Sequence, residues 1–237
     1  MQHTLNGQVI ATFGRHLIVR AAGGQELRAR PFGRSLAAVC GDEVRCRIDA
    51  HHDEAHVVAV LPRRSALWRT SKRGAAEAVV ANLTQLLVML APLPRPELFV
   101  VDRYLAAASA AGVPALLVIN KSDLGIPASL APELAAYAAA GYDALKCSAA
   151  TGEGLAALAG ALAPRALAAL VGQSGVGKSS LVRRLVPQAE VEIGALVRAS
   201  DGRHTTTAAR LFDLPQGAAL IDSPGGARFR PCRHGAR

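Results

Sequence analysis

The chain has 237 residues, of which 51% are hydrophobic and 19% are charged. This length fits one large domain or two modest ones, and the apolar content excludes a fibre, a mini-protein and a disordered tail. The formal net charge of +9 indicates a polyanionic partner. The first 73 residues carry 12 Lys and Arg against 6 Asp and Glu, so most of the positive excess lies in the N-terminal third.

No segment predicts a membrane span or an export signal. The most apolar stretch, around 155–171, is interrupted by Pro164 and Arg165 before it reaches the ~18 residues that a bilayer span needs. The N-terminus lacks a basic segment followed by an apolar one. We therefore expect a cytoplasmic protein with no membrane partner. The cysteines form no CxxC pair, so we expect reduced, mostly buried thiols rather than disulfides.

The first seventy residues alternate between apolar and polar positions in short segments separated by glycines. The predicted strands are 8–13, 16–21, 26–30, 43–48 and 56–61. Five short strands at this spacing predict an all-β barrel of the OB type. The charged, aperiodic run 62–74 is predicted to be a linker. We therefore expect a barrel domain at 1–70 and a second domain at 75–237.

The second domain alternates apolar strand patterns with alanine-rich helical ones. Strands are predicted at 85–90, 115–119, 143–147, 167–171, 209–212 and 218–221, and helices at 96–111, 131–140, 154–162 and 178–186. This order predicts an α/β domain with a mostly parallel sheet and helices on both faces.

The strongest motif is a GxxxxGK[ST] phosphate loop between a predicted strand and a predicted helix. Its residues are Gly172, Gln173, Ser174, Gly175, Val176, Gly177, Lys178, Ser179 and the adjoining Ser180. The glycines let backbone N–H groups turn toward phosphate, Lys178 neutralises the β and γ oxygens, and the Ser179 hydroxyl ligates Mg²⁺. A glycine turn that binds nothing is the alternative, and the motif alone leaves ATP and GTP both open.

A second motif selects between the two bases. Asn120, Lys121, Ser122 and Asp123 follow a predicted strand, where a parallel sheet places ligand groups. The Asp123 carboxylate can accept from N1–H and from the exocyclic amine of guanine, which adenine does not offer. Ser148 and Ala149 follow the next strand, and their backbone can complete a guanine pocket. A P-loop ATPase remains the rival only if this NKSD motif is a simple turn.

Further polar residues surround the phosphate side. Asp222 closes a predicted strand in a DSPG sequence, as expected of an aspartate that reaches Mg²⁺ through water, and the Gly225 N–H is expected to face the γ-phosphate. The run GRHTTT, 202–207, is placed like a first switch. Thr205 or Thr206 can complete the Mg²⁺ shell, or either can be plain solvated loop.

The motif order is NKxD, SA, phosphate loop, threonine switch and DxPG, which is a circular permutation of the order in ordinary GTPases. Cutting a closed α/β fold at another surface loop leaves the same pocket. The chain thus resembles the circularly permuted, ribosome small-subunit-dependent GTPases, the RsgA (YjeQ) family. The resemblance implies GTP hydrolysis stimulated by the small ribosomal subunit, GTP, GDP and Mg²⁺ as ligands, binding to ribosomal RNA, and a monomer. Six barrel arginines are candidate RNA contacts: Arg15, Arg20, Arg28, Arg30, Arg45 and Arg47.

The chain departs from ordinary GTPases at the residue that orients the attacking water. Gly226 stands where they place a glutamine. His204, in the switch, is the candidate substitute, because the ordinary pKa of histidine lies near neutrality. His204 and Lys178 are the two predicted catalytic residues. A surface histidine without a catalytic role is the alternative.

The last residues resemble part of the family's zinc pattern, C-x4-C-x-H-x5-C. Cys232 and His234 match its second cysteine and its histidine, whereas Ala227 stands at the first cysteine. Two ligands do not make a closed zinc site, so zinc binding is expected of the family and the site is incomplete here. The chain also stops twelve residues after Gly225, so we expect the family's C-terminal zinc domain to be largely missing. If this truncation removes hydrolysis, the alternative function is a nucleotide-dependent RNA-binding module.

Overall fold

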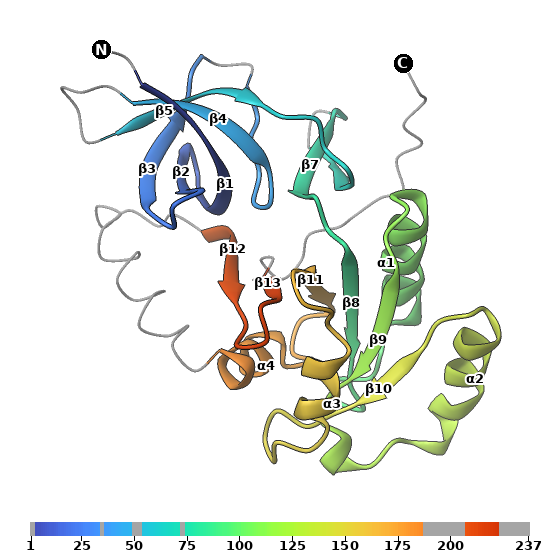
Figure 1. Cartoon of the computed structure of the whole chain (residues 1–237). Coiled ribbons are helices and arrows are strands. Elements are labelled where there is room, and N and C mark those ends of the chain that lie inside the picture. Colours follow the sequence, from blue (N-terminus) through green and yellow to red (C-terminus); the bar gives the residue numbers. More distant parts are fainter. Residues whose placement is uncertain (1–2, 34–35, 49–53, 72–73, 187–206, 223–237) are drawn as a thin grey trace.

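The structure, a computed structural model, describes residues 3–33, 36–48, 54–71, 74–186 and 207–222 (Figure 1). Its N-terminal part is a five-stranded barrel made of β1 (His3–Phe13), β2 (His16–Ala21), β3 (Glu26–Pro31), β4 (Glu43–Ile48) and β5 (Ala55–Val60). The strands pair in the order β1-β2-β3-β5-β4, and β4 pairs back with β1. The OB-type barrel predicted from the sequence is confirmed.

The barrel has its own small core because alternate residues of each strand point inward. That core contains Val9, Leu17, Val19, Ala29, Val44, Cys46, Ala55 and Val57, all buried. The residues between them, such as Arg28 and Arg45, are exposed. Two strands, β2 and β4, have the predicted bounds.

The predicted linker, 62–74, was wrong for residues 66–70, which form the first strand of a β-hairpin. β6 (Ala66–Thr70) pairs with β7 (Ala76–Ala81) in an antiparallel two-stranded sheet. Its charged side chains belong to the solvent face, where Arg69 bonds Glu77 at 3.2 Å, whereas Leu67 and Val80 are buried. The charges therefore marked one face of a hairpin rather than a solvated connection.

The second part of the chain is an α/β domain. Its elements are β8 (Gln85–Leu90), α1 (Leu98–Ala110), β9 (Ala115–Ile119), the 3-10 turns η1 (Ser122–Leu124) and η2 (Ala128–Leu130), α2 (Ala131–Ala139), β10 (Ala144–Lys146), α3 (Leu155–Gly160), β11 (Leu167–Gly172), α4 (Lys178–Leu185), β12 (Thr207–Asp213) and β13 (Ala219–Asp222). The strand order is β10-β9-β8-β11-β13-β12, parallel except for the β12–β13 pair. Every predicted strand and helix of this domain is present, with bounds that differ by a few residues at most.

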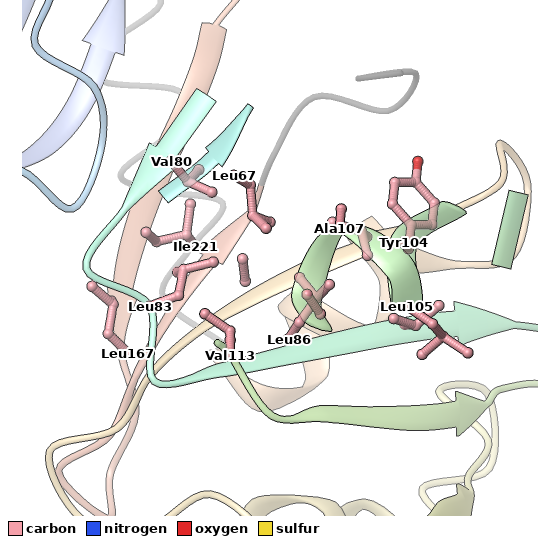
Figure 2. Close-up of a cluster of buried hydrophobic side chains, with 14 of the residues drawn as sticks. Leu67, Val80, Leu83, Leu86, Tyr104, Leu105, Ala107, Val113, Leu167 and Ile221 are labelled. Carbon is pink, nitrogen blue, oxygen red and sulfur yellow. The ribbon is translucent and has the colours of Figure 1, made fainter. Parts of the chain in front are cut away.

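Helices pack on both faces of this sheet, as predicted. On one face, Tyr104 and Leu105 of α1 belong to the same buried cluster as Leu86 of β8 and the hairpin residues Leu67 and Val80 (Figure 2). On the other face, α3 and α4 cover a second cluster that includes the fully buried leucines at 158, 170 and 181. Both clusters are almost wholly aliphatic.

The barrel and the α/β sheet are joined by hydrogen bonds between strands. β1 pairs antiparallel with β12, with Ala11 opposite Arg210 and Thr12 opposite Ala209. Barrel and domain therefore share one sheet of 11 strands, and Figure 1 shows β12 directly beneath the barrel. Within the part of the chain that is described, no helix is long and apolar enough to cross a bilayer.

Candidate functional site

The predicted site residues converge because β8, β9, β10, β11 and β13 are parallel and end at the same edge of the sheet. The phosphate loop follows β11, the NKSD motif follows β9, the Ser148-Ala149 loop follows β10, and Asp222 ends β13. Motifs that are separated by up to a hundred residues in the sequence thus share one edge, where open α/β sheets bind ligands.

The phosphate loop requires glycine at two positions. Gly172 and Gly177 have φ values of 154° and 96°, which L side chains rarely adopt. A Cβ at Gly172 would collide with the carbonyl oxygen of Met89, and a Cβ at Gly177 would collide with the Asn120 amide. The loop therefore packs tightly against β8 and the NKSD motif, and Gly177 directly precedes the first residue of α4.

The side chain of Lys178 folds back into the phosphate loop. Its side chain is buried, and its Nζ donates to the carbonyl oxygens of Gly172 and Gln173, both at 2.8 Å. Burial lowers the pKa of Lys178, and the nearby carboxylate of Asp222 partly opposes that effect. Burial likewise raises the pKa of Asp222, against the influence of Lys178. The ammonium of Lys178 and the carboxylate of Asp222 are thus close enough to influence each other's pKa at the phosphate end, where Ser179 is exposed.

Asn120 connects the phosphate loop to both halves of the predicted base site. Only 1% of it is exposed. Its Nδ2 donates to the Val176 carbonyl at 2.8 Å, and its Oδ1 accepts from the Ala149 N–H at 3.0 Å. The sequence identified Asn120 as a ligand-binding residue, and the structure gives it a role in holding three loops together.

Lys121 and Asp123 lie toward solvent at the same edge. The Lys121 Nζ donates to the Gly175 carbonyl at 2.8 Å and to the Leu93 carbonyl at 2.9 Å, so it crosses the phosphate loop. Asp123 is exposed. Ser122 Oγ is buried and has no hydrogen-bond partner within the described ranges.

The loop after β10 is held by its own backbone and by two other elements. Ser148 is fully buried, its N–H donates to the Glu153 carbonyl at 2.9 Å, and its Oγ accepts from the Thr151 N–H at 3.1 Å. On its outer side, Arg184 of α4 donates to the carbonyls of Ala149 and Ala150. Sequence analysis missed Arg184, because an arginine at the end of a helix ordinarily points to solvent.

The segment between β8 and α1 is a second contribution that the sequence did not indicate. The Glu97 N–H donates to Gln173 Oε1 at 3.0 Å, which fixes the side chain of a phosphate-loop residue. Leu93, in the same segment, supplies the carbonyl that Lys121 binds. The prolines at 92, 94 and 96 could have indicated this segment in the sequence, because they favour a rigid loop.

Several predicted site residues lie outside the described residues: His204, Thr205, Thr206, Gly225, Cys232 and His234. Their predicted roles stay predictions. Across the described ranges, no cluster of three or more His, Cys, Asp and Glu side chains is arranged to hold a metal ion. Ser179 and Asp222 are hard oxygen donors of the kind that Mg²⁺ takes in phosphate-loop enzymes, where substrate oxygens and water fill the remaining positions.

Comparison with known proteins agrees with this arrangement. The sequence model described as RsgA GTPase matches residues 60–230. "Small ribosomal subunit biogenesis GTPase RsgA" of Azotobacter vinelandii is 44% identical over 232 residues, which are 94% of this chain and 67% of that protein. The protein of the same name from Pseudomonas fluorescens Pf0-1 is 44% identical over 234 residues, with the same coverage. The chain thus spans about two thirds of the length of these relatives.

Two solved structures share this fold, and one of them is described as circularly permuted. YjeQ from Thermotoga maritima matches with a TM-score of 0.69 and 25% identity, over 95% of this chain and 76% of that chain. YloQ, described as a circularly permuted GTPase, matches with a TM-score of 0.62 and 21% identity, over 94% of this chain and 72% of that chain. The permuted motif order in the sequence is thereby confirmed as a permuted fold.

Proposed function

Since the chain belongs to the RsgA GTPase family, we propose that it binds and hydrolyses GTP in the biogenesis of the small ribosomal subunit. We further propose that it acts in the cytoplasm as a monomer and contacts ribosomal RNA. The observation that carries the proposal is the junction at Asn120, which bonds the phosphate loop through Val176 and the predicted base loop through Ala149. Because the buried Asn120 side chain bonds both loops, the proposed phosphate site and the proposed base site belong to a single nucleotide site.

Guanine recognition is assigned to Asp123 and to the backbone of the loop after Ser148. The exposed Asp123 carboxylate has two acceptor oxygens for the N1–H and the exocyclic amine of guanine. Lys121, which is anchored across the phosphate loop, provides a flat aliphatic stem beside the base. Adenine has neither an N1–H nor an amine at that position, so the same carboxylate discriminates against ATP.

The phosphates are assigned to the backbone N–H groups of the loop, the N-terminus of α4 and Lys178. When bound, Mg²⁺ neutralises phosphate charge, with Ser179, Thr206 and Asp222 as its proposed protein partners. Lys178 holds its ammonium group in the loop through the carbonyls of Gly172 and Gln173, so it is already positioned beside the phosphate path. The Gly225 N–H is assigned to the γ-phosphate.

Hydrolysis requires a group that orients the attacking water. Gly226 carries no side chain for this purpose, and we assign the role to His204. A neutral imidazole can accept a proton from water at one nitrogen while the other donates a hydrogen bond. The Lys178 charge stabilises the transferring phosphoryl group, so binding and water orientation are assigned to different residues.

Ribosomal RNA is assigned to the outer surface of the barrel. Arg28 and Arg30 on β3 and Arg45 on β4 are exposed, since the residues between them fill the barrel core. Three of the barrel arginines also have partners within the protein: Arg20 bonds Asp213 at 2.9 Å, Arg30 bonds Glu54 at 2.8 Å, and Arg47 lies over the Phe32 ring. Phosphate contacts by the exposed arginines account for the positive charge of this region.

The proposal is tested by measuring GTP turnover of the whole chain alone, with purified small ribosomal subunits, and with large subunits as the control. We expect small subunits to raise turnover and large subunits to leave it unchanged. The Lys178→Ala variant controls for contaminating GTPases in the ribosome preparation. Equal turnover with both subunits would overturn the ribosomal assignment, and a preference for ATP over GTP would overturn the nucleotide assignment.

A further inference from the structure

Arg184 links the phosphate end of the candidate site to its base end. It lies on α4, six residues after Lys178, and therefore about 9 Å further along the helix axis. Its Nε donates to the Ala149 carbonyl at 2.8 Å, and its Nη2 donates to the Ala150 carbonyl at 2.6 Å. The helix that begins in the phosphate loop thus ends on the loop proposed to read the base.

The first of these bonds, to the Ala149 carbonyl, fixes the orientation of the Ala149–Ala150 peptide, and the second holds the peptide that follows it. In a planar trans peptide the carbonyl and the following N–H point in opposite directions. Because the Ala149 carbonyl faces Arg184, the Ala150 N–H points to the opposite side of the peptide, away from Arg184. Guanidinium bonds to carbonyls are charge-assisted and hold such an orientation more firmly than neutral ones.

The Ala150 N–H differs from its neighbours in having no protein acceptor among the residues that the structure describes. The Ala149 N–H donates to Asn120 Oδ1, and the Thr151 N–H donates to Ser148 Oγ. The loop is therefore fixed from the inside by Asn120 and from the outside by Arg184. Between these two anchors it retains one backbone donor for a ligand.

We infer that Arg184 is a positioning residue for base selection, which orients the Ala150 N–H toward the oxygen at position 6 of guanine. The inference rests on the proposed guanine site. Guanine has a hydrogen-bond acceptor at position 6. Adenine has an amine there, which is a donor and cannot accept a hydrogen bond from the Ala150 N–H. Arg184 thus supports the discrimination that Asp123 makes on the other side of the base.

The test compares Arg184→Ala with Arg183→Ala in the whole chain. Arg183 is the next residue on α4, so both variants remove one positive charge from the same helix. GDP affinity is measured for both, together with the affinity for 6-thio-GDP, which keeps the donors for Asp123 but replaces the oxygen with sulfur, a weaker acceptor. Thermal unfolding without nucleotide reports the stability of each variant.

We expect Arg184→Ala to weaken GDP binding roughly three- to tenfold, as for the loss of one or two hydrogen bonds, and to leave the thermal midpoint unchanged. Arg184→Ala should weaken the binding of 6-thio-GDP by a smaller factor than the binding of GDP. The substitution and the sulfur atom both act on the same hydrogen bond, so their effects should not add. Arg184→Lys, which reaches one carbonyl, should fall between wild type and Arg184→Ala.

Four outcomes would overturn the inference. An equal loss in Arg183→Ala would make the effect one of net charge. An equal loss for GDP and 6-thio-GDP, or a lowered thermal midpoint, would make Arg184 a general structural residue. Unchanged GDP affinity in Arg184→Ala would remove its role altogether. If the wild-type chain does not prefer GDP over ADP, the proposed guanine site fails first, and this measurement distinguishes the two failures.

Discussion

Asp123 is an exposed carboxylate with two acceptor oxygens at the sheet edge. Asp123→Asn replaces one acceptor with a donor that faces the donors of guanine. We expect GTP affinity to fall about tenfold or more, as for the loss of a hydrogen bond to a charged group, and xanthosine triphosphate to bind better because its base has a carbonyl at that position. Competition binding measures both. Asp143→Asn, at an exposed aspartate before β10, is the matched control, and equal GTP affinity in the two variants would contradict the assignment.

His204 and Lys178 should separate hydrolysis from binding. We expect His204→Ala to leave GTP affinity nearly unchanged and to lower subunit-stimulated turnover roughly 10²-fold, the low end for a positioned acid–base group. Lys178→Ala should weaken binding itself, because its ammonium neutralises phosphate charge. Equilibrium binding and single-turnover hydrolysis measure the two effects. Wild-type turnover in His204→Ala would assign water orientation to another group.

The site residues that the sequence identified are those with fixed motif spacing. Lys178 and Asn120 follow strands, and a parallel sheet brings such residues to one edge whatever their separation in the chain. Arg184 has no such signal. Its role depends on the distance between α4 and the loop after β10, which only packing determines, and Asn120 was assigned to the ligand although most of its hydrogen-bonding capacity is used within the protein.

At the scale of elements, the segment before β6 attaches the hairpin to the barrel through a buried ion pair. Arg63 binds Asp42 through Nε and Nη2 at 2.7 and 2.8 Å, and Asp42 is fully buried. We expect Arg63→Ala to lower the free energy of unfolding by about 2–4 kcal/mol, because it leaves a buried carboxylate without its cation. Urea unfolding measures the loss.

The neighbouring residue provides the control for that prediction. Arg64 pairs with Glu43 at 2.9 Å, but both side chains are largely exposed. Arg64→Ala should therefore cost no more than about 0.5 kcal/mol. Equal losses of unfolding free energy in Arg63→Ala and Arg64→Ala would show that the burial of Asp42 does not determine how much the Arg63–Asp42 ion pair contributes.

Elements with a clear period were predictable, and those defined by long-range pairing were not. β4 alternates charged and apolar residues, and β2 is a short apolar run that ends at Arg20 and Ala21 before a pair of glycines, so their bounds came out as predicted. The hairpin was missed because its exposed face carries the charged Arg69 and Glu77, whereas its buried residues are few and half of them are alanines: Ala66, Leu67, Val80 and Ala81. The β1–β12 pair joins residues some two hundred positions apart, and neither strand alone indicates its partner.

At the scale of the whole molecule, the charge excess of the barrel sets the salt dependence of RNA binding. We expect affinity for the small subunit to fall log-linearly with salt concentration, and Arg28→Gln with Arg45→Gln to reduce that slope by about 1.5. Lys146→Gln with Arg165→Gln removes two charges from the α/β domain and is the control. Titrations at several salt concentrations measure the slopes, and equal slopes for the two double variants would place the RNA contact elsewhere.

The pairing of β1 with β12 also determines how the protein can be divided. A fragment of residues 75–237 would lose the strand that covers β12, and the backbone donors and acceptors around Ala209 and Arg210 would become an open strand edge. Such edges pair with other chains. We expect this fragment to self-associate as its concentration rises, which sedimentation velocity would detect, whereas the whole chain stays monomeric. We therefore expect the barrel to protect the nucleotide-binding domain from self-association by covering the edge of β12.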